Sequence, residues 1–198
     1  MARADRAHRA AQRALDDRTG AKLGDLLRAL EDPMTQAAFD AYNVASAAVV
    51  GGAQRRAAQL AIAYVATQVP TRPKRPPSAA RALAGVVVSR TSPVTRSPIL
   101  RVWGKVGEGL AVAAAIENAA AYAATLASND LQVAQRGGLD EGASASGAKI
   151  IGWRKELSDD ACDWCQTVGE DSVYSSPDGV PFHANDECSV APVFEGEE

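Results

Sequence analysis

The sequence predicts a mainly α-helical body followed by a small β-rich module, and three observations lead to this fold class. Apolar residues recur at helical spacing through residues 2–31 and again through residues 33–69. A further series of this kind runs from Ile99 to Val133, and alanine is abundant in all of these segments. After residue 148 the pattern changes to short apolar runs separated by turn residues, which is typical of β-strands.

The first 69 residues are expected to form two helices. In residues 2–31 the leucines follow an i, i+3, i+4 pattern, at Leu15, Leu23, Leu26, Leu27 and Leu30. Asp32 and Pro33 are typical of the N-cap and the first turn of a following helix. Gly51 and Gly52 lower the helix propensity of that second segment, so they predict a kink in it.

A proline-rich segment interrupts the helical body. Residues 70–77 read Pro-Thr-Arg-Pro-Lys-Arg-Pro-Pro, which is incompatible with a helix and predicts an exposed, extended basic linker. Ser97 and Pro98 are expected to open a second long helix, and Gly137 and Gly138 are a typical signal for its end. We expect the two long helices to pack as an antiparallel pair, because the linker gives the chain room to reverse direction.

The same patterns divide the chain into a helical body over residues 1–138, a hinge over residues 139–148 that is rich in Gly, Ser and Ala, and a C-terminal module over residues 149–198. Strands are expected near both ends of the module, at residues 149–154 and 189–194. A module of about 50 residues with few large apolar side chains is marginally stable alone, and a bound metal can supply on the order of 10 kcal/mol of folding free energy.

The strongest chemical signal in the chain is a group of sulfur and imidazole side chains in this module. All three cysteines, Cys162, Cys165 and Cys188, and one of the two histidines, His183, lie in one short stretch. A Cys-x-x-Cys pair followed by a histidine and a further cysteine supplies four ligands at spacings that suit a tetrahedral Zn²⁺ site. The alternative is a Cys162–Cys165 disulfide or redox pair with Cys188 as a leftover thiol, but no βαβ pattern surrounds the pair.

Three thiolates and one imidazole close the tetrahedron, so the sequence favours a structural zinc over a catalytic one. The other histidine, His8, is expected on a solvated face of the first helix and is too far along the chain to join a hydrolytic site. No Ser/His/Asp or Cys/His constellation is recognisable, and we expect a protein that is not an enzyme. The predicted fold class is thus mainly α, with long Ala-rich helices and a small zinc-bound β-rich C-terminal module.

Charge is strongly segregated along the chain. Residues 41–107 carry ten basic and no acidic side chains, whereas residues 140–198 carry three basic and fourteen acidic ones. Such asymmetry suggests contact with two different environments, although solvated helix faces would also explain it. The candidate contact residues for DNA or for an acidic protein are Arg72, Lys74, Arg75, Arg81, Arg90 and Arg96.

Alanine-rich helices leave narrow apolar stripes that one chain does not fully cover. In the predicted helix from Ile99 to Val133 the stripe includes Trp103, Leu110 and Tyr122, so Trp103 is a candidate partner contact. The longest apolar run is too short to span a bilayer, and no N-terminal hydrophobic stretch suggests secretion. We therefore expect a protein made in a reducing cytoplasm, with no membrane partner.

The C-terminal module resembles the phage Mu F-like minor head protein family. The similarity rests on Gly152-Trp153-Arg154, on Asp160-Ala161-Cys162-Asp163-Trp164-Cys165, on Phe182-His183-Ala184-Asn185 and on the ending from Cys188 to Phe194. Cys162, Cys165, His183 and Cys188 match the metal-type positions of the family, and Trp153 and Pro192 match its framework. The usual His-x-x-Cys-x-Cys ending is replaced here by His183-x-x-x-x-Cys188.

This resemblance covers about 45 residues and implies a minor capsid component of a tailed phage. It implies a location in the virion, inside the capsid at the portal vertex, after assembly in the host cytoplasm. It further implies a role in head morphogenesis or genome delivery, with the portal protein as partner, several copies around the portal, and possible contacts to the major capsid protein and packaged DNA. The alternative is a zinc-stabilised DNA-binding protein that uses its basic central segment, although its cysteine-rich module is acidic.

Overall fold

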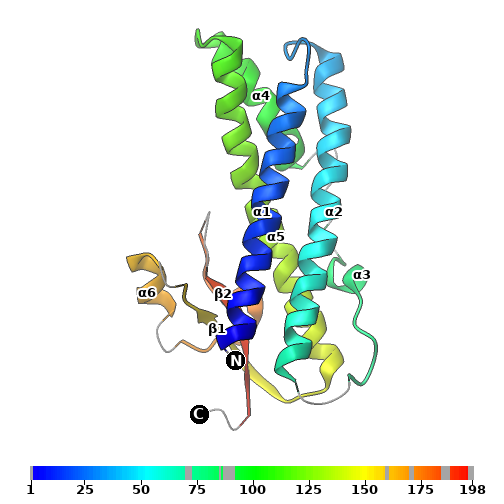
Figure 1. Ribbon diagram of the computed structural model, residues 1–198, viewed down its shortest axis with the longest axis vertical. Helices are drawn as coiled ribbons and strands as arrows, with labels where there is room; N and C mark the ends of the chain where they lie inside the picture. The colour runs from blue at the N-terminus through cyan, green and yellow to red at the C-terminus, as the bar shows by residue number, and fades with distance from the viewer. Residues whose placement is uncertain are drawn as a thin grey trace. The chain divides into compact units, whose positions relative to one another are not determined.

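The computed structural model describes residues 2–69, 73–84, 86, 92–158, 161–169, 172–183 and 188–195. It confirms a mainly α-helical chain with a small two-stranded antiparallel sheet near the C-terminus (Figure 1). The elements, in chain order, are α1 Ala2–Arg28, α2 Gln36–Gln68, α3 Ala79–Ala82, α4 Pro93–Gly107, α5 Val112–Ser146, β1 Ile150–Glu156, α6 Asp163–Gly169, the 3₁₀ helix η1 Pro177–Gly179 and β2 Ser189–Phe194.

The chain divides into two compact units. Unit 1 contains Met1–Arg13, Gln54–Val86 and Gln132–Glu198, and unit 2 contains Ala14–Ala53 and Val87–Leu131. The helices α1, α2 and α5 each contribute residues to both units. The C-terminal strands therefore share unit 1 with the ends of three helices.

Within unit 1, α1 runs antiparallel to α2, and α2 runs parallel to α5. Tyr64 of α2 donates a hydrogen bond to Asp5, while Gln12 donates to the carbonyl of Ala57, so the numbering of α1 and α2 runs in opposite directions. By contrast, Gly138 of α5 lies against Ala58, and Gly142 lies against Val65. The expected antiparallel pairing of the two long helices is wrong, because these contacts make α2 and α5 parallel, and α3 and α4 lie between them among the described residues of the chain.

The double glycine in α5 does not end the helix. The expected stop at Gly137 and Gly138, and the hinge over residues 139–148, are wrong, since α5 continues to Ser146. A Cβ atom on Gly137 would lie 2.2 Å from the carbonyl oxygen of Ala82, and one on Gly138 would lie 2.5 Å from that of Ala58. These glycines thus permit the backbones of neighbouring helices to approach closely, and the helix tolerates their low propensity because of that packing.

Replacing Gly138 with alanine should destabilise the protein by about 2 kcal/mol, because the added methyl forces α5 away from α2. Gly51 of α2 provides the matched control, since no described atom beyond its own stretch of helix backbone and its chain neighbours lies within 4 Å of the Cβ position there. Gly51→Ala should be neutral or stabilising by up to about 1 kcal/mol, through its higher helix propensity. Urea denaturation of both variants measures the difference, and equal stabilities would contradict the close packing.

The sheet of unit 1 brings the two ends of the C-terminal module together. Strands β1 and β2 pair antiparallel, with Trp153 opposite Pro192, and both expected strands are confirmed. Tyr174 forms a bridge on the other side of β1, through hydrogen bonds of 2.8 and 2.7 Å between its backbone and that of Trp153. The sheet packs on the helices in one hydrophobic cluster, whose buried members include Trp153, Val190, Ala191, Val65 and Leu139. This packing anchors the module.

Unit 2 has its own hydrophobic core, formed by α1, α2, α4 and α5 residues that include Leu27, Tyr42, Ile99, Val102 and Ala119. The expected single helix from Ser97 to Val133 is two helices, because the chain turns between α4 and α5 at Gly109, whose φ is +96°. Only glycine adopts such a backbone conformation at little cost. Within this unit α1 is antiparallel to α5, as shown by Gly24 lying against Ala120 and Gly20 against Ala124.

Candidate metal centre

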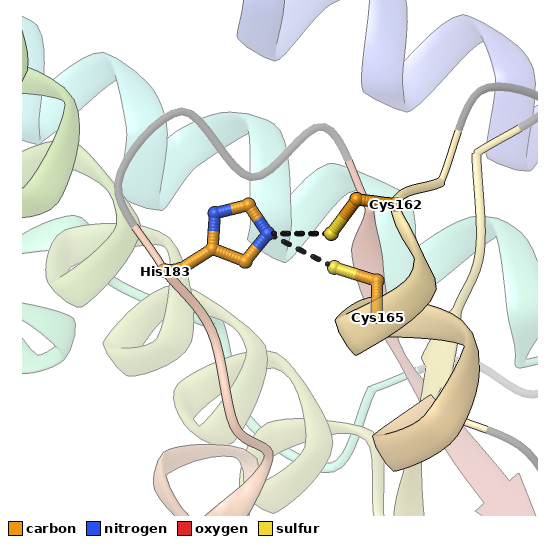
Figure 2. A group of neighbouring side chains, drawn as sticks. All are labelled: Cys162, Cys165 and His183. Carbon is orange, nitrogen blue, oxygen red and sulfur yellow. Dashed lines mark hydrogen bonds between the residues drawn. The ribbon is translucent and has the colours of Figure 1, made fainter.

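Three of the four predicted ligands meet in the C-terminal module. Cys162 directly precedes α6, Cys165 lies in its first turn, and His183 lies between η1 and β2. Figure 2 shows the imidazole pointing at both thiols, with His183 Nε2 3.3 Å from Cys162 Sγ and 3.1 Å from Cys165 Sγ. The ligand atoms of all three residues lie within 4.8 Å of one another. This group could hold a metal ion.

The spacing of these atoms suits a tetrahedral ion. Zinc bond lengths of about 2.3 Å to sulfur and 2.0–2.1 Å to nitrogen place a nitrogen and a sulfur ligand about 3.6 Å apart. The observed separations are a few tenths of an ångström shorter, so small side-chain rotations would admit the ion. None of the three cysteines forms a disulfide, so the disulfide alternative is not what the structure contains.

The backbone around the cysteines favours the thiolate that a metal needs. The pKa of Cys162 is lowered, mainly by a hydrogen bond from the backbone N–H of Cys165, with further contributions from the Cys165 and His183 side chains and the N–H of Trp164. Cys162 is exposed, whereas Cys165 is buried. The site therefore has one side toward solvent and one side against the module.

Hydrogen bonds attach both ligand-bearing segments to β1. The hydroxyl of Tyr174, the bridge residue beside Trp153, donates to the carbonyl of Val168 in α6 at 2.9 Å. Lys155 of β1 donates from Nζ to the carbonyl of Pro181 at 2.9 Å, two residues before His183. The cysteine pair and the histidine are thus held over the same strand from two sides.

The fourth predicted ligand, Cys188, is not in the three-residue group. Its Sγ lies 3.8 Å from the hydroxyl oxygen of Ser158, and the residue directly precedes β2. Cys188 as the ligand that completes the tetrahedron stays a prediction, and Cys162, Cys165 and His183 are the residues that the fold brings together.

An aromatic side chain that is not among the predicted ligands lies beside the site. Trp164 is exposed, and its ring meets the His183 ring edge-on, with the centroids 5.3 Å apart. Lys155 Nζ lies 5.0 Å from the centroid of the same ring. The sequence feature that points to Trp164 is its position between Cys162 and Cys165, which places it next to any ion bound there.

The candidate basic contacts separate into different environments. Arg72 and Arg90 lie outside the described residues. Arg75 and Arg81 bind the buried carboxylate of Glu141 in α5, and the contacts from Arg75 are 2.6 and 2.8 Å long. The backbone N–H of Ser78 donates to the same carboxylate at 2.9 Å. Arg75 of the proline-rich segment and Arg81 of α3 are therefore both joined to α5 through Glu141.

The remaining candidates, Lys74, Arg96 and Trp103, make other kinds of contact. Lys74 is exposed, and its backbone N–H donates to the carbonyl of Ala145. Arg96 is exposed and lies 5.9 Å from the centroid of the Phe39 ring. Trp103 is half-buried in the core of unit 2, where its Nε1 donates to the carbonyl of Pro33 at 2.6 Å. Trp103 thus serves the packing of unit 2.

The Glu141 carboxylate is expected to stabilise the proline-rich segment. Hydrogen bonds from Arg75, and then from Ser78 and Arg81, lower the pKa of Glu141 to about 2 against the effect of its burial. Glu141→Ala should cost about 2 kcal/mol, since hydrogen bonds to a charged group are lost. The wild-type contribution is present above pH 4.5, the ordinary pKa of the carboxyl, and is lost as the pH falls toward 2.

Limited proteolysis at pH 7 can measure this effect, because residues 73–82 should be cleaved faster in Glu141→Ala than in the wild type. Asp140→Ala, which changes an exposed carboxylate next to it in α5, is the matched control. Equal cleavage rates in the two variants would contradict the stabilising role of Glu141.

His8 occupies a buried polar network, and the expectation of a solvated face is wrong. Its side chain is stacked on Tyr64 with ring centroids 4.4 Å apart, and the residue is 6% exposed. Gln135 Nε2 lies 3.0 Å from His8 Nε2 and donates to it. Burial lowers the pKa of His8 to about 4, so the imidazole is neutral at pH 7. The alanine-rich composition around His8 gave no sign of this packing.

Among the described helices, none combines the length and the apolar character needed to cross a membrane. Comparison of the chain with protein-family models, with curated proteins and with solved structures gave no match.

Proposed function

We propose that Cys162, Cys165 and His183 bind one structural zinc ion in a non-enzymatic protein that acts in the head of a tailed phage. The observation that supports the metal site is the meeting of three ligands from two separate segments within 4.8 Å. Two thiolates and an imidazole are ligands that zinc prefers, and hard cations such as Mg²⁺ select oxygen instead. Cys188 is the proposed fourth ligand.

The proposed role of the ion is to join α6 to the segment before β2. The module buries few large side chains of its own, and the described hydrogen bonds that fasten its two ligand-bearing segments come from Tyr174, the bridge partner of Trp153, and from Lys155 of β1. A metal that bridges them would supply folding free energy that this packing does not.

The proposed role in the phage head rests on the similarity to the Mu F-like minor head proteins. The framework positions of that resemblance, Trp153 and Pro192, are opposite one another in the sheet, and the metal-type positions Cys162, Cys165 and His183 form the cluster. This order of tryptophan strand, cysteine pair, histidine and terminal strand supports the proposal. The DNA-binding alternative is less well supported, since Arg75 and Arg81 already bind Glu141.

The partner that we propose is the portal protein, with several copies of the chain around it and with the major capsid protein and packaged DNA as further neighbours. Trp103→Ala would disturb the core of unit 2, so exposed apolar residues are better probes of docking. Leu110 and Val112, at the turn between α4 and α5, are both exposed. Their replacement by serine should weaken association with the portal without removing core contacts.

The test is co-purification with the portal protein of the same phage, together with imaging of intact particles. We expect the wild-type chain to co-purify and to occupy density beside the portal, and Leu110→Ser with Val112→Ser to lower the amount retained about tenfold or more. Val173→Ser, at an exposed apolar position in the C-terminal module, is the matched control. A chain that stays monomeric, ignores the portal and is absent from mature heads would contradict the proposal and favour the DNA-binding alternative.

A further inference from the structure

The two cysteines of the candidate metal centre differ in their access to solvent. Cys162 is exposed, whereas Cys165 is buried, with 2% of its surface accessible. The susceptibility of a cysteine to oxidation follows the thiolate character of its sulfur and its exposure. Sulfur that binds a metal is deprotonated, so at a metal-bound site Cys162 has both properties and Cys165 has only the first. A soluble oxidant therefore reaches Cys162 first.

Cys165 is well placed to react with an oxidised Cys162. Cys162 directly precedes α6 and Cys165 lies in its first turn, where the Cys165 backbone N–H is hydrogen-bonded to the Cys162 sulfur. Residues one helical turn apart have Cα atoms about 5 Å apart, within the roughly 4.4–6.8 Å that a disulfide spans. The two Sγ atoms lie within 4.8 Å of one another. A disulfide between them requires no unfolding of α6.

The third thiol is less well placed for this reaction. Cys188 is not among the three residues whose ligand atoms lie within 4.8 Å of one another, and its Sγ lies 3.8 Å from the hydroxyl oxygen of Ser158. Cys165 is therefore the thiol that an oxidised Cys162 meets within the cluster.

We propose that Cys162 is an oxidation site at which hydrogen peroxide releases the metal ion, an inference that rests on the proposed zinc site. The Cys162 thiolate attacks the peroxide, the O–O bond breaks, and a sulfenic acid and a hydroxide are formed. The Cys165 thiolate then attacks the Cys162 sulfur, the S–O bond breaks, and a second hydroxide leaves as the disulfide forms. Each thiolate loses one electron to the peroxide, and two protons from solvent convert both hydroxides to water.

The disulfide removes two ligands of the proposed site in one reaction. Even with Cys188 as the fourth ligand, one imidazole and one thiolate remain, which is half of a structural zinc site. The segments that carry the ligands keep their hydrogen bonds from Tyr174 and Lys155. The metal bridge between α6 and the segment of His183 is nevertheless broken. Reduction of the disulfide by a thiol restores both ligands, so the oxidation is reversible.

The test uses the full chain, purified anaerobically with its metal. About one equivalent of hydrogen peroxide should release the zinc, measured with a chromogenic chelator, and peptide mass spectrometry should find a Cys162–Cys165 disulfide in the same proportion. Dithiothreitol should reverse both changes. Reduced protein that contains no zinc would overturn the proposed metal site itself. Zinc that stays bound, or that leaves with a Cys162–Cys188 disulfide or with sulfinic acid and no disulfide, would overturn this inference alone.

A variant separates the loss of the exposed thiol from other effects of peroxide. Cys162→His keeps a zinc ligand at the exposed position but cannot form the disulfide. Peroxide should release zinc from this variant about tenfold more slowly than from the wild type. Thr167→His, at an exposed position of α6, keeps both thiols and is the matched control for the added imidazole. Equal release rates in the two variants would contradict the assignment, and the disulfide map of the wild type tests it without any substitution.

Discussion

Removal of the proposed metal ion is expected to unfold residues 150–194 while most of the helical signal persists. The free energy of zinc binding to a structural site is on the order of 10 kcal/mol and is lost with the ion. Because Trp153 belongs to the hydrophobic cluster that also contains Tyr64 and Leu139, the loss should loosen the neighbouring ends of α2 and α5 too. Chelation followed by circular dichroism and tryptophan fluorescence measures both effects.

Substitution of the proposed ligands distinguishes the effect of metal binding from general effects on packing. Cys165→Ser and His183→Ala should each reduce the metal content well below one ion per chain and reproduce the unfolding seen on chelation. Cys188→Ser tests the predicted fourth ligand, since it should lower metal affinity if Cys188 coordinates and leave it unchanged if it does not. Protein purified without chelators that contains no metal, and whose Cys162 and Cys165 form a disulfide, would rule out the site.

Acidification is expected to destabilise the protein through His8. Its pKa of about 4 in the folded protein lies below the ordinary value of 6.5, so the unfolded chain binds the proton first as the pH falls. Above pH 6.5 the imidazole is neutral in both the folded and the unfolded state, so its burial does not make stability depend on pH. From pH 6.5 down to pH 4 the free energy of unfolding declines by about 3 kcal/mol in total. Between pH 7.5 and pH 5 the expected loss is about 2 kcal/mol.

Asp16 and Asp130 also have shifted pKa values, so the effect of His8 is measured by comparing the wild type with a variant that lacks this histidine. Burial raises the pKa of Asp16 to about 6, which adds stability as the pH falls from 6 toward 3.8 and opposes the effect of His8. Burial also raises the pKa of Asp130. The difference in unfolding free energy between wild type and His8→Gln cancels these contributions. It should change by about 2 kcal/mol between pH 7.5 and pH 5, and a constant difference would show that His8 does not titrate in this way.

The candidate metal ligands could be predicted from the sequence because they are chemically rare and close together in the chain. Cys162 and Cys165 are three residues apart, and one turn of α6 is enough to present both thiols to the same side. His183 follows within the same module, and the strands that position it, β1 and β2, were recognisable from their local pattern. Such features depend on short-range spacing, which the sequence displays directly.

Other properties of this protein depended on contacts between residues far apart in the chain. The low helix propensity of glycine predicted that the helix would end at Gly138. The residue lies inside α5 instead, because Ala58 of α2 packs against its backbone. The composition of the first helix predicted that His8 would be solvated, but contacts with Tyr64 and Gln135 bury it. The sequence predicted Arg75 and Arg81 as cations available to DNA or to an acidic protein, but in the structure both bind Glu141 of α5.

The sequence by itself thus determined the helical class, the β-rich ending and the identity of the clustered ligands, since each follows from local periodicity or from scarce side-chain chemistry. The tertiary structure decided the parallel direction of α2 and α5, the partners of the basic residues and the burial of His8. These depend on which helix faces meet, and the helices are so rich in alanine that many faces look alike in the sequence. Close approach at particular glycines and buried hydrogen bonds selects among those faces, and both exist only once the chain has folded.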